Sequence, residues 1–342
     1  MASLPFELRA TAIDDALVAS LADYTRVGLD GVRDTRGIVG VGRPARARRA
    51  SVPGYAVSFG YRWRWRDEWD QTWWPQGIAV GEHGGKPVAL VSWYAQGKRG
   101  VEQGSRISFV ELSDPRRPSY RHVLLVSPRQ TDAGVVLDPV LAHAGGIAWI
   151  GDRLLIAATF DGIREFRLGD ILRAHRGRGP FGYDFVLPES AHHRALEPSA
   201  MQRMRYSFIT SDPAAAADGG SNLIVGEYGR DNVGRVARLT MSGDRSLITE
   251  TYAPGIQHMQ GAAVVRDRTS IETWFVSASN GQRSGDLWVG AIDNLRNLAG
   301  QLPPGPEALA VWQNRNQLWS VSEIPGKRFI YAMDVDRLTA EK

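Results

Sequence analysis

A short pattern recurs along this chain of 342 residues and constrains its fold more than any other feature. Each copy begins with a small residue inside an apolar run, and a second and a third apolar run follow in the same order. The small residues that anchor the copies are Gly77, Gly146, Ser207, Gly261 and Ala308. Repeats of this kind are typical of folds that copy one unit around an axis. Small anchors suit an innermost strand, where neighbouring copies crowd together.

The apolar runs are short, rich in Val, Ile, Trp and Tyr, and separated by Gly, Asn, Asp and Pro, which is typical of strands. Five copies of one pattern predict an all-β, five-bladed β-propeller, because a two-sheet sandwich does not require such repetition. Outer strands are expected at 120–126, 182–188 and 246–252, with a short one around 299–303. The last copy lacks an outer strand. The segment 55–61 could supply it by pairing beside 328–334, which would remove two exposed sheet edges.

The first residues differ from the repeats. Ile13, Leu17 and Leu21 recur at helical spacing, so residues 8–24 are predicted to form a short N-terminal helical segment. The following stretch is rich in Gly, Arg and Pro. We therefore divide the chain into an N-terminal helix with a basic linker or strap over 1–54 and the propeller over 55–342. The arginines between 43 and 49 are interpreted as a solvated linker, because no nucleic-acid motif accompanies them.

Composition excludes several classes of protein. The chain has no cysteine, which excludes disulfides, thiolate metal sites and a cysteine nucleophile. No apolar run is long enough for a membrane span, and the first residues lack the order of a signal peptide. The net charge is only +4, so we expect no nucleic-acid partner. We also expect a monomer. It would be cytoplasmic, or exported if a signal segment has been removed.

Antiparallel geometry predicts where a site lies. The start of the first strand and the end of the second strand of each blade share one face, so polar residues there converge on one channel mouth. The residues at strand starts are Trp74, Gln76, His143, His258, Gln260 and Glu307. The residues at strand ends are Trp93, Tyr94, Thr159, Glu227, Tyr228, Asn280 and Glu323. This convergence predicts a site for a small-molecule or carbohydrate ligand.

Two histidines are the first candidates for catalysis. His143 and His258 each stand three positions before an anchor glycine, so they are expected to face each other across the mouth. Imidazole changes charge near neutral pH, which suits an acid/base pair assisted by Glu227 or Glu323. The alternative is that both histidines only hydrogen-bond neighbouring blades. Trp74, Trp93 and Tyr94 would stack on the ligand.

The glutamates form a second candidate set. A carboxylate near the channel axis is costly to bury unless it is paired or bound. Glu227, Glu307 and Glu323 could act as bases, or could lock the blades by accepting hydrogen bonds from main-chain amides. We expect no cofactor and no transition metal, because no HxH or HExxH spacing occurs. Calcium stays open, since Glu227, Glu307 and Asn280 could supply oxygen ligands.

The segments WPQGIAV, HAGGIAW, LIVGEYG, MQGAA and LWSVSEIPGKR resemble those of a group of actinobacterial propeller proteins, often exported and of unknown function. This resemblance implies the fold and no reaction. The strand starts QGIA and PEALA have a looser similarity to calcium-dependent lactonases and strictosidine synthase-like propellers. The Glu/Asn/Asp calcium set of that family cannot be mapped residue by residue onto this sequence, so its chemistry is not implied.

Two kinds of function fit these patterns. The first is an enzyme, a hydrolase, lyase or cyclase, that acts on a small molecule or glycoside by acid/base chemistry at the mouth. The second is a non-catalytic ligand-binding (lectin-like) or protein-interaction propeller. A lectin repeats its site in most blades, whereas the matching positions here hold different residues. The sequence therefore favours one asymmetric central site.

Overall fold

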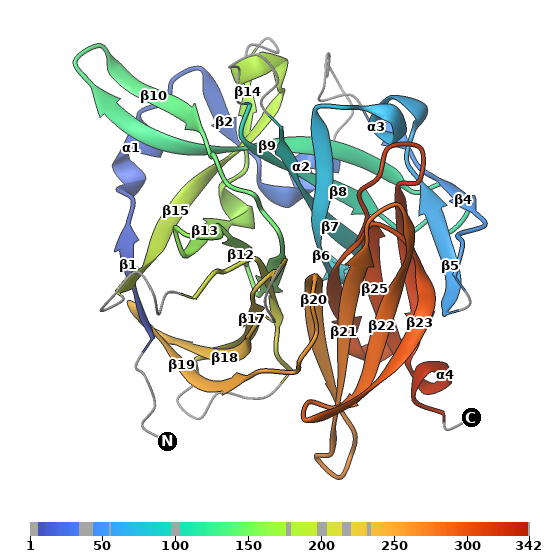
Figure 1. Ribbon diagram of the computed structural model, residues 1–342. Coiled ribbons are helices and arrows are strands. Elements are labelled where there is room, and N and C mark those ends of the chain that lie inside the picture. The colour runs from blue at the N-terminus through green and yellow to red at the C-terminus, as the bar shows by residue number, and fades with distance from the viewer. Residues whose placement is uncertain are drawn as a thin grey trace.

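The computed structural model describes residues 6–33, 44–54, 56–96, 103–175, 179–196, 204–213, 220–230 and 234–340. The chain is all-β apart from short helices, as predicted (Figure 1). Arg43 of the basic run and Tyr55 of the predicted closing strand lie outside the described residues. No helix in the described ranges is both long and apolar enough to cross a membrane.

Each repeat forms an antiparallel sheet, named here after its innermost strand. The β6 sheet contains β6 (Trp73–His83), β7 (Lys86–Ala95), β8 (Ser105–Glu111) and β9 (Ser119–Thr131). The β11 sheet contains β11 (Ile147–Ile150), β12 (Arg153–Ala157), β13 (Ile163–Arg167) and β15 (Phe185–Leu196). The β16 sheet contains β16 (Phe208–Ser211), β17 (Ser221–Gly226), β18 (Val236–Ser242) and β19 (Arg245–Tyr252).

The two remaining sheets come from the last third of the chain. The β20 sheet contains β20 (Met259–Arg266), β21 (Glu272–Asn280), β22 (Arg283–Ala291) and β23 (Asn294–Pro304). The β24 sheet contains β24 (Pro306–Trp312), β25 (Gln317–Ser322), β26 (Phe329–Asp334), β5 (Val57–Arg62) and β4 (Arg48–Ala50). Strand β23 is longer than the predicted segment around 299–303, because its first half is mostly exposed and polar, with only two leucines to indicate a strand.

The predicted pairing of the two chain ends is confirmed. Strand β5 lies antiparallel to β26, with Arg62 opposite Phe329 and Val57 opposite Met333. In Figure 1 the blue β5 lies beside the red C-terminal strands. The innermost strands contact one another in a cycle, from β6 to β11, β16, β20, β24 and back to β6. Strand β16 also approaches β24 and β6 across the axis, so the channel is narrow.

The small anchors stand where the inner strands crowd. A Cβ atom on Gly77 would lie 2.8 Å from Gly146, and one on Gly146 would lie 2.3 Å from the backbone nitrogen of Ile209. A Cβ atom on Gly261 would lie 2.7 Å from the Cα atom of Ala308. These distances are shorter than side chains tolerate, which is the physical reason for the repeat that the sequence displays.

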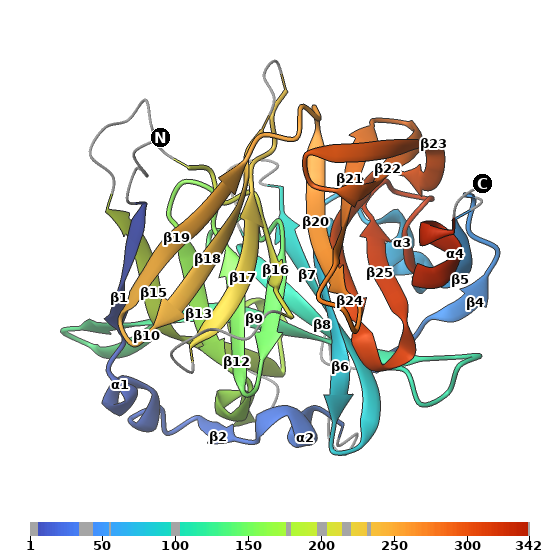
Figure 2. The same cartoon turned by 90° about the horizontal axis from the view of Figure 1, so that it is seen from below.

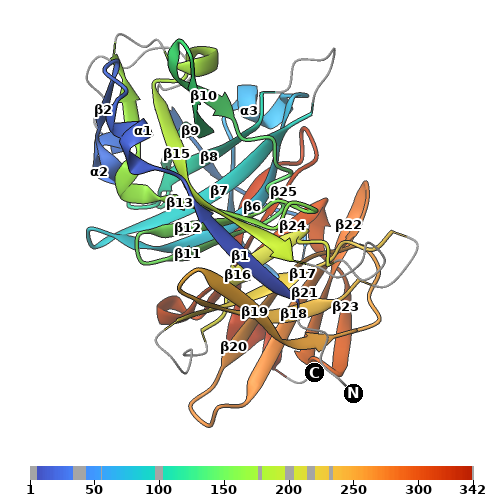
Figure 3. The ribbon, with the colours of Figure 1, turned by 90° about the vertical axis from the view of Figure 1, so that its left-hand side faces the viewer.

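The N-terminal segment differs from its prediction. A helix was predicted over 8–24, but β1 (Glu7–Ala12) is a strand, and α1 (Asp15–Ala19) and α2 (Gly28–Arg33) are short helices around β2 (Tyr24–Arg26). The reason is non-local. The outer strands β15 and β19 present unpaired edges, and β1 pairs with both (Figure 3). Pairing across the chain therefore overrides the local helical spacing.

Further short elements fasten the outer strands. Strand β2 pairs with β14 (Leu172–Ala174), and β3 (Ala45–Arg46) and β10 (Gly134–Pro139) both pair with β9. Strand β15 also runs parallel to β9 over three residues. The elements α1, β2 and α2 follow one another along the outside of these sheets (Figure 2). The remaining helices are α3 (Trp65–Trp69) and α4 (Val335–Thr339). Short 3-10 helices span Leu168–Asp170, Pro180–Gly182 and Gln313–Arg315.

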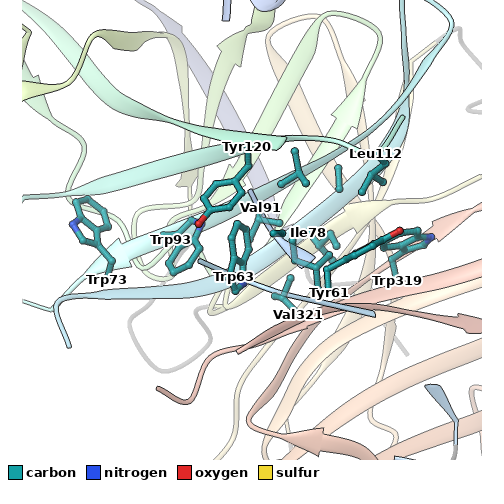
Figure 4. Close-up of a cluster of buried hydrophobic side chains, with 14 of the residues drawn as sticks. Tyr61, Trp63, Trp73, Ile78, Val91, Trp93, Leu112, Tyr120, Trp319 and Val321 are labelled. Atoms are coloured by element: carbon teal, nitrogen blue, oxygen red, sulfur yellow. The ribbon is translucent and has the colours of Figure 1, made fainter. Parts of the chain in front are cut away.

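Aromatic side chains fill the space between the β6 and β24 sheets (Figure 4). The ring of Trp63 meets the rings of Trp93 and Tyr120 edge-on, with centroids 4.8 Å away in both cases. Trp319 and Val321 of β25 belong to the same cluster. Such edge-to-face pairs stabilise a core beyond the area that they bury. This cluster therefore joins the first sheet of the chain to the last.

Candidate functional site

A cavity of about 800 Å³ opens at the end of the channel where the innermost strands begin. Every sheet contributes to its wall. Most of the predicted site residues line it, namely Gln76, Tyr94, His143, Thr159, Tyr228, Gln260, Glu307 and Glu323. Its size and its convergent polar groups are those of a small-ligand site.

β-Bulges orient the residues at the base of this cavity. The pairing register shifts between Pro75 and Gly77, between Met259 and Gly261, and between Pro306 and Leu309. The residues within these shifts include Gln76, Gln260 and Glu307. A bulge re-aims a side chain out of the ordinary alternation. These positions directly precede three of the anchors, so the same local geometry is repeated around the channel.

Glu307 and Glu323, named here the carboxyl pair, both line the cavity, and the charge of Glu323 acts on Glu307. Gln260 Nε2 donates to Glu307 Oε1 at 3.3 Å, and Gln76 Nε2 donates to Glu323 Oε2 at 2.9 Å. Glu307 is only 1% exposed. Burial, and then the charge of Glu323, raise the pKa of Glu307 well above its usual range. Burial also raises the pKa of Glu323, although the bond from Gln76 opposes it.

The backbone fixes Glu323 in place. Its N–H donates to the carbonyl of Gly305 at 2.9 Å, and Arg328 Nε donates to its carbonyl at 2.7 Å. The pair thus sits on a rigid support while its carboxyl groups face amides. Ionising both groups would place two like charges in one buried site, which is why the pKa of Glu307 is raised further by the charge of Glu323.

An aromatic wall flanks this pair. The rings of Tyr94 and His143 lie 4.2 Å apart. His143 has exposed surface at the rim, yet the atoms packed around its ring exclude water from it and lower its pKa, which favours the neutral imidazole. Burial raises the pKa of Tyr94 to about 12. A second hollow of about 500 Å³ shares both residues, so the wall separates two spaces that open at the same mouth.

The expected histidine pair does not form. His258 lies outside the cavity lining, and its ring stacks on Tyr228 with centroids 5.7 Å apart. Its backbone has a φ of 56°, and its N–H donates to the carbonyl of Gly229. This left-handed conformation turns the residue away from the path that the repeat predicts. Only His143 of the two lines the mouth.

Glu227 is engaged elsewhere. Its carboxylate accepts from the backbone N–H groups of Arg205 and Arg235 and from the Arg235 guanidinium. Burial acts to raise the pKa of Glu227, but the bonds from Arg235 outweigh it and the pKa is lowered. Glu227 therefore locks the backbone, which is the alternative role that the sequence left open.

Trp93, Trp74 and Asn280 do not line the cavity. Trp93 is fully buried between sheets and donates from its indole to Ser108 Oγ. It alternates with Tyr94 along β7, so only one of the two faces the channel. Trp74 donates to the carbonyl of Gln71, and Asn280 closes the β21–β22 turn. The predicted oxygen ligands for calcium, Glu227, Glu307 and Asn280, thus have separate partners.

Several lining residues were missed by the sequence rule, namely Phe160, Asp161, Arg205, Ser207 and Arg230. Their positions in the sequence could have indicated them. Arg205 stands two positions before an anchor, and Arg230 stands two positions after Tyr228. Extending the rule by two residues past each second strand would have included Phe160, Asp161 and Arg230, whereas Arg205 already lay within the rule's span before an anchor. Within the described ranges, no three His, Asp or Glu side chains gather closely enough to hold a metal ion.

A smaller hollow of about 320 Å³ lies at the opposite mouth, where the innermost strands end. Its lining includes Trp149, Trp312 and Gln313, and its titratable group is Glu82. Glu82 is half exposed and pairs with Arg315 at 3.4 Å. This mouth lacks the buried carboxyl pair, so the first cavity is the better candidate for chemistry.

Comparison with known proteins leaves the function open. No model of a known protein family matches the sequence, and no curated protein matches it. Among solved structures, a glycoside hydrolase shares 9% identity and a TM-score of 0.45, covering 82% of this chain and 92% of its own. A GH43_1 enzyme from Xanthomonas citri shares 12% identity and a TM-score of 0.35, covering 76% and 86%.

A nidogen/laminin complex shares 13% identity and a TM-score of 0.34, covering 78% of this chain and 90% of its own. These similarities are too weak to assign an activity. The propeller is instead defined by the sheets and by the cycle of innermost strands described above.

Proposed function

We propose that this chain is an enzyme that hydrolyses a small molecule or glycoside at the channel mouth, with Glu307 and Glu323 as its acid/base pair. One observation supports the proposal most strongly. Two glutamates from one sheet line the same cavity, and the side chains that donate hydrogen bonds to their carboxyl groups are neutral glutamine amides. Buried carboxyls that are held by neutral amides are costly to keep for stability alone, so their presence favours a chemical role.

Glu307, the more deeply buried group, is the protonated acid in this proposal. It gives its proton to the leaving oxygen as the carbon–oxygen bond breaks. Glu323 is the carboxylate and accepts a proton from the attacking water, whose oxygen forms the new bond. Gln76 holds Glu323 in place. Solvent then returns one proton to Glu307 and removes one from Glu323, which completes the cycle.

The aromatic wall formed by Tyr94 and His143 would bind the substrate. Tyr94 and the neutral His143 offer a flat surface and hydroxyl and imidazole groups for hydrogen bonds to a sugar. The volume of about 800 Å³ falls in the usual range for small-ligand sites. These features make a carbohydrate the leading substrate class.

We further propose that the sheets are the five blades of a closed, monomeric propeller. The cycle of innermost strands and the β5–β26 pairing support this assignment. A crystal structure and a mass measurement in solution test it, and a sixth blade or a stable dimer would contradict it.

The test of the function is a turnover screen with chromogenic glycosides, esters and lactones. Glu307→Gln and Glu323→Gln are expected to lower kcat by roughly 10² to 10⁴ while preserving the fold. Glu82→Gln, at the opposite mouth, is the matched control and is expected to keep full activity. Activity that survives both cavity substitutions contradicts the proposal. Ligand binding without any turnover favours the non-catalytic binding propeller.

A further inference from the structure

The cavity has a basic side as well as an acidic one. Arg205 precedes β16 and Arg230 follows β17, so both arginines come from the β16 sheet. Glu307 and Glu323 come from the β24 sheet. The β16 and β24 sheets are not consecutive in the cycle of innermost strands, and their innermost strands approach each other across the axis. The site is therefore polarised across the channel.

Neither guanidinium forms a salt bridge with a carboxylate among the described residues. Asp161, the other acidic group in the lining, is already engaged, with its carboxylate 2.7 Å from Arg164 and 3.4 Å from His192. Glu227 takes only the backbone N–H of Arg205 and leaves that side chain to the cavity. The wall thus presents two positive groups to whatever enters.

We propose that this cavity binds a ligand with an anionic group, which contacts Arg205 and Arg230 while the rest of the ligand extends toward Glu307 and Glu323. The orientation toward the glutamates rests on the proposed function, whereas anion binding does not. A planar guanidinium matches a carboxylate or phosphate in two parallel hydrogen bonds. Sugar acids such as uronic acids and sugar phosphates carry such a group beside a ring of suitable size.

This inference also explains the asymmetry of the site. A neutral sugar needs hydroxyl partners on all sides, whereas a sugar acid needs one charged wall and one wall for its reacting bond. Because the arginines and the glutamates come from different sheets, the anionic group of the substrate would bind nearer to the arginines than to the like-charged glutamates. Charge placement would therefore fix the direction in which the ligand binds.

The experiment compares matched ligands by calorimetry. The pairs are methyl glucuronide with methyl glucoside, and glucose 6-phosphate with glucose, each at low and at high salt. The anion of at least one pair is expected to bind roughly tenfold more tightly than its neutral partner, and the difference is expected to shrink as salt rises. The better anion distinguishes a carboxylate ligand from a phosphate ligand.

Variants locate the effect. The preference for the anion is expected to disappear in Arg205→Gln/Arg230→Gln and to persist in the control Arg315→Gln at the opposite mouth. The inference is overturned if no anion binds better than its neutral partner, or if the preference survives in the double variant. Glu307→Gln is expected to keep anion binding and lose turnover. Turnover that is unaffected by this change would defeat the proposed function and leave the anion site standing.

Discussion

Two buried acidic regions of the molecule behave in opposite ways. Asp67 of α3 accepts bonds from Arg106, His122 and Tyr120. Burial acts to raise the pKa of Asp67, but His122 and Arg106 outweigh it and hold the pKa far below its usual range. Glu307 is at least as buried, has an amide partner, and its pKa is raised. The charged partners that bind the Asp67 carboxylate therefore account for the opposite direction of its pKa shift.

The Asp67 region contains a serine, a histidine and an aspartate in the order of a hydrolytic triad. Ser108 Oγ lies 2.8 Å from His122 Nδ1, and His122 Nε2 lies 3.0 Å from Asp67. Ser108 is fully buried, however, and its oxygen accepts the indole N–H of Trp93. No substrate can reach it. These hydrogen bonds fasten α3 to the β6 sheet, so the role of this buried arrangement is structural.

Arg328 connects the two regions. Its Nε donates to the carbonyl of Glu323, and its Nη1 donates to the carbonyl of Asp67. The guanidinium is fully buried and lies over the rings of Trp74 and Trp93. The Asp67 region thus supports the backbone of Glu323. Rigid support of this kind is what positions groups for catalysis.

The largest expected effect is a loss of stability when the charge of Asp67 is removed. Asp67→Asn leaves Arg106 buried without its charged partner, which typically costs about 3 to 5 kcal/mol. Because the pKa of Asp67 is lowered by folding, its contribution is complete above its ordinary pKa and is lost as pH falls. Urea melts at neutral and acidic pH measure this. The exposed Asp30→Asn is the control, and equal stability of the two variants would contradict the comparison.

The second largest expected loss of stability is that of Ser108→Ala. It leaves the indole N–H of Trp93 and the Nδ1 of His122 without a partner, so we expect a loss of about 1 to 3 kcal/mol. Turnover and reaction with serine-directed fluorophosphonates should both be unchanged, because the hydroxyl is inaccessible. Labelling of Ser108, found by mass spectrometry, would show instead that this region is the active site.

The two histidines sharpen the boundary of the site. His143 lines the cavity and His258 does not. His143→Ala is therefore expected to weaken ligand binding by roughly tenfold, the effect of losing one good contact. His258→Ala should change binding little, because it acts only through the stack on Tyr228. Calorimetry on both variants measures this, and a larger loss in His258→Ala would restore the predicted histidine pair.

The smallest effect is a dependence of stability on pH. The pKa of Glu307 is raised by folding, so wild-type stability falls as pH rises from the ordinary carboxyl pKa through the raised one. Glu307→Gln cannot ionise and should lose less stability over that range. Thermal melts of both proteins between weakly acidic and weakly alkaline pH test this. If the stability of both proteins changed with pH in the same way, ionisation of Glu307 would not destabilise the folded protein, which would contradict the prediction.

Local pattern predicted much of the fold. The anchors at Gly77, Gly146 and Gly261 mark inner strands because any larger side chain there would collide with its neighbours. Strand β1 was missed because its pairing with β15 and β19 is non-local. Strand β23 was underestimated because its exposed half is polar. Burial leaves a local pattern of apolar residues in a sequence, whereas pairing with the exposed edge of a distant strand leaves none.

The candidate site was predicted less completely. Repeat geometry brought Gln76, Glu307 and Glu323 to one mouth, because equivalent positions must converge. It failed for His258, where a left-handed backbone redirects the residue, and for Trp93, which the alternation of β7 turns into the core. The sequence also could not tell that Glu227 would meet Arg235 while Glu307 would meet only an amide. Roles depend on partners that only the folded chain brings together.

The most direct test of the account is the titration of the carboxyl pair itself. Carbon NMR of protein labelled at the glutamate carboxyls can follow Glu307 and Glu323, assigned with Glu307→Gln and Glu323→Gln. We predict that Glu307 stays protonated well above the usual range and that Glu323→Gln lowers its pKa by removing the neighbouring charge. A Glu307 resonance that titrates in the ordinary carboxyl range, unchanged by Glu323→Gln, would contradict the claim that this pair holds the proton for catalysis.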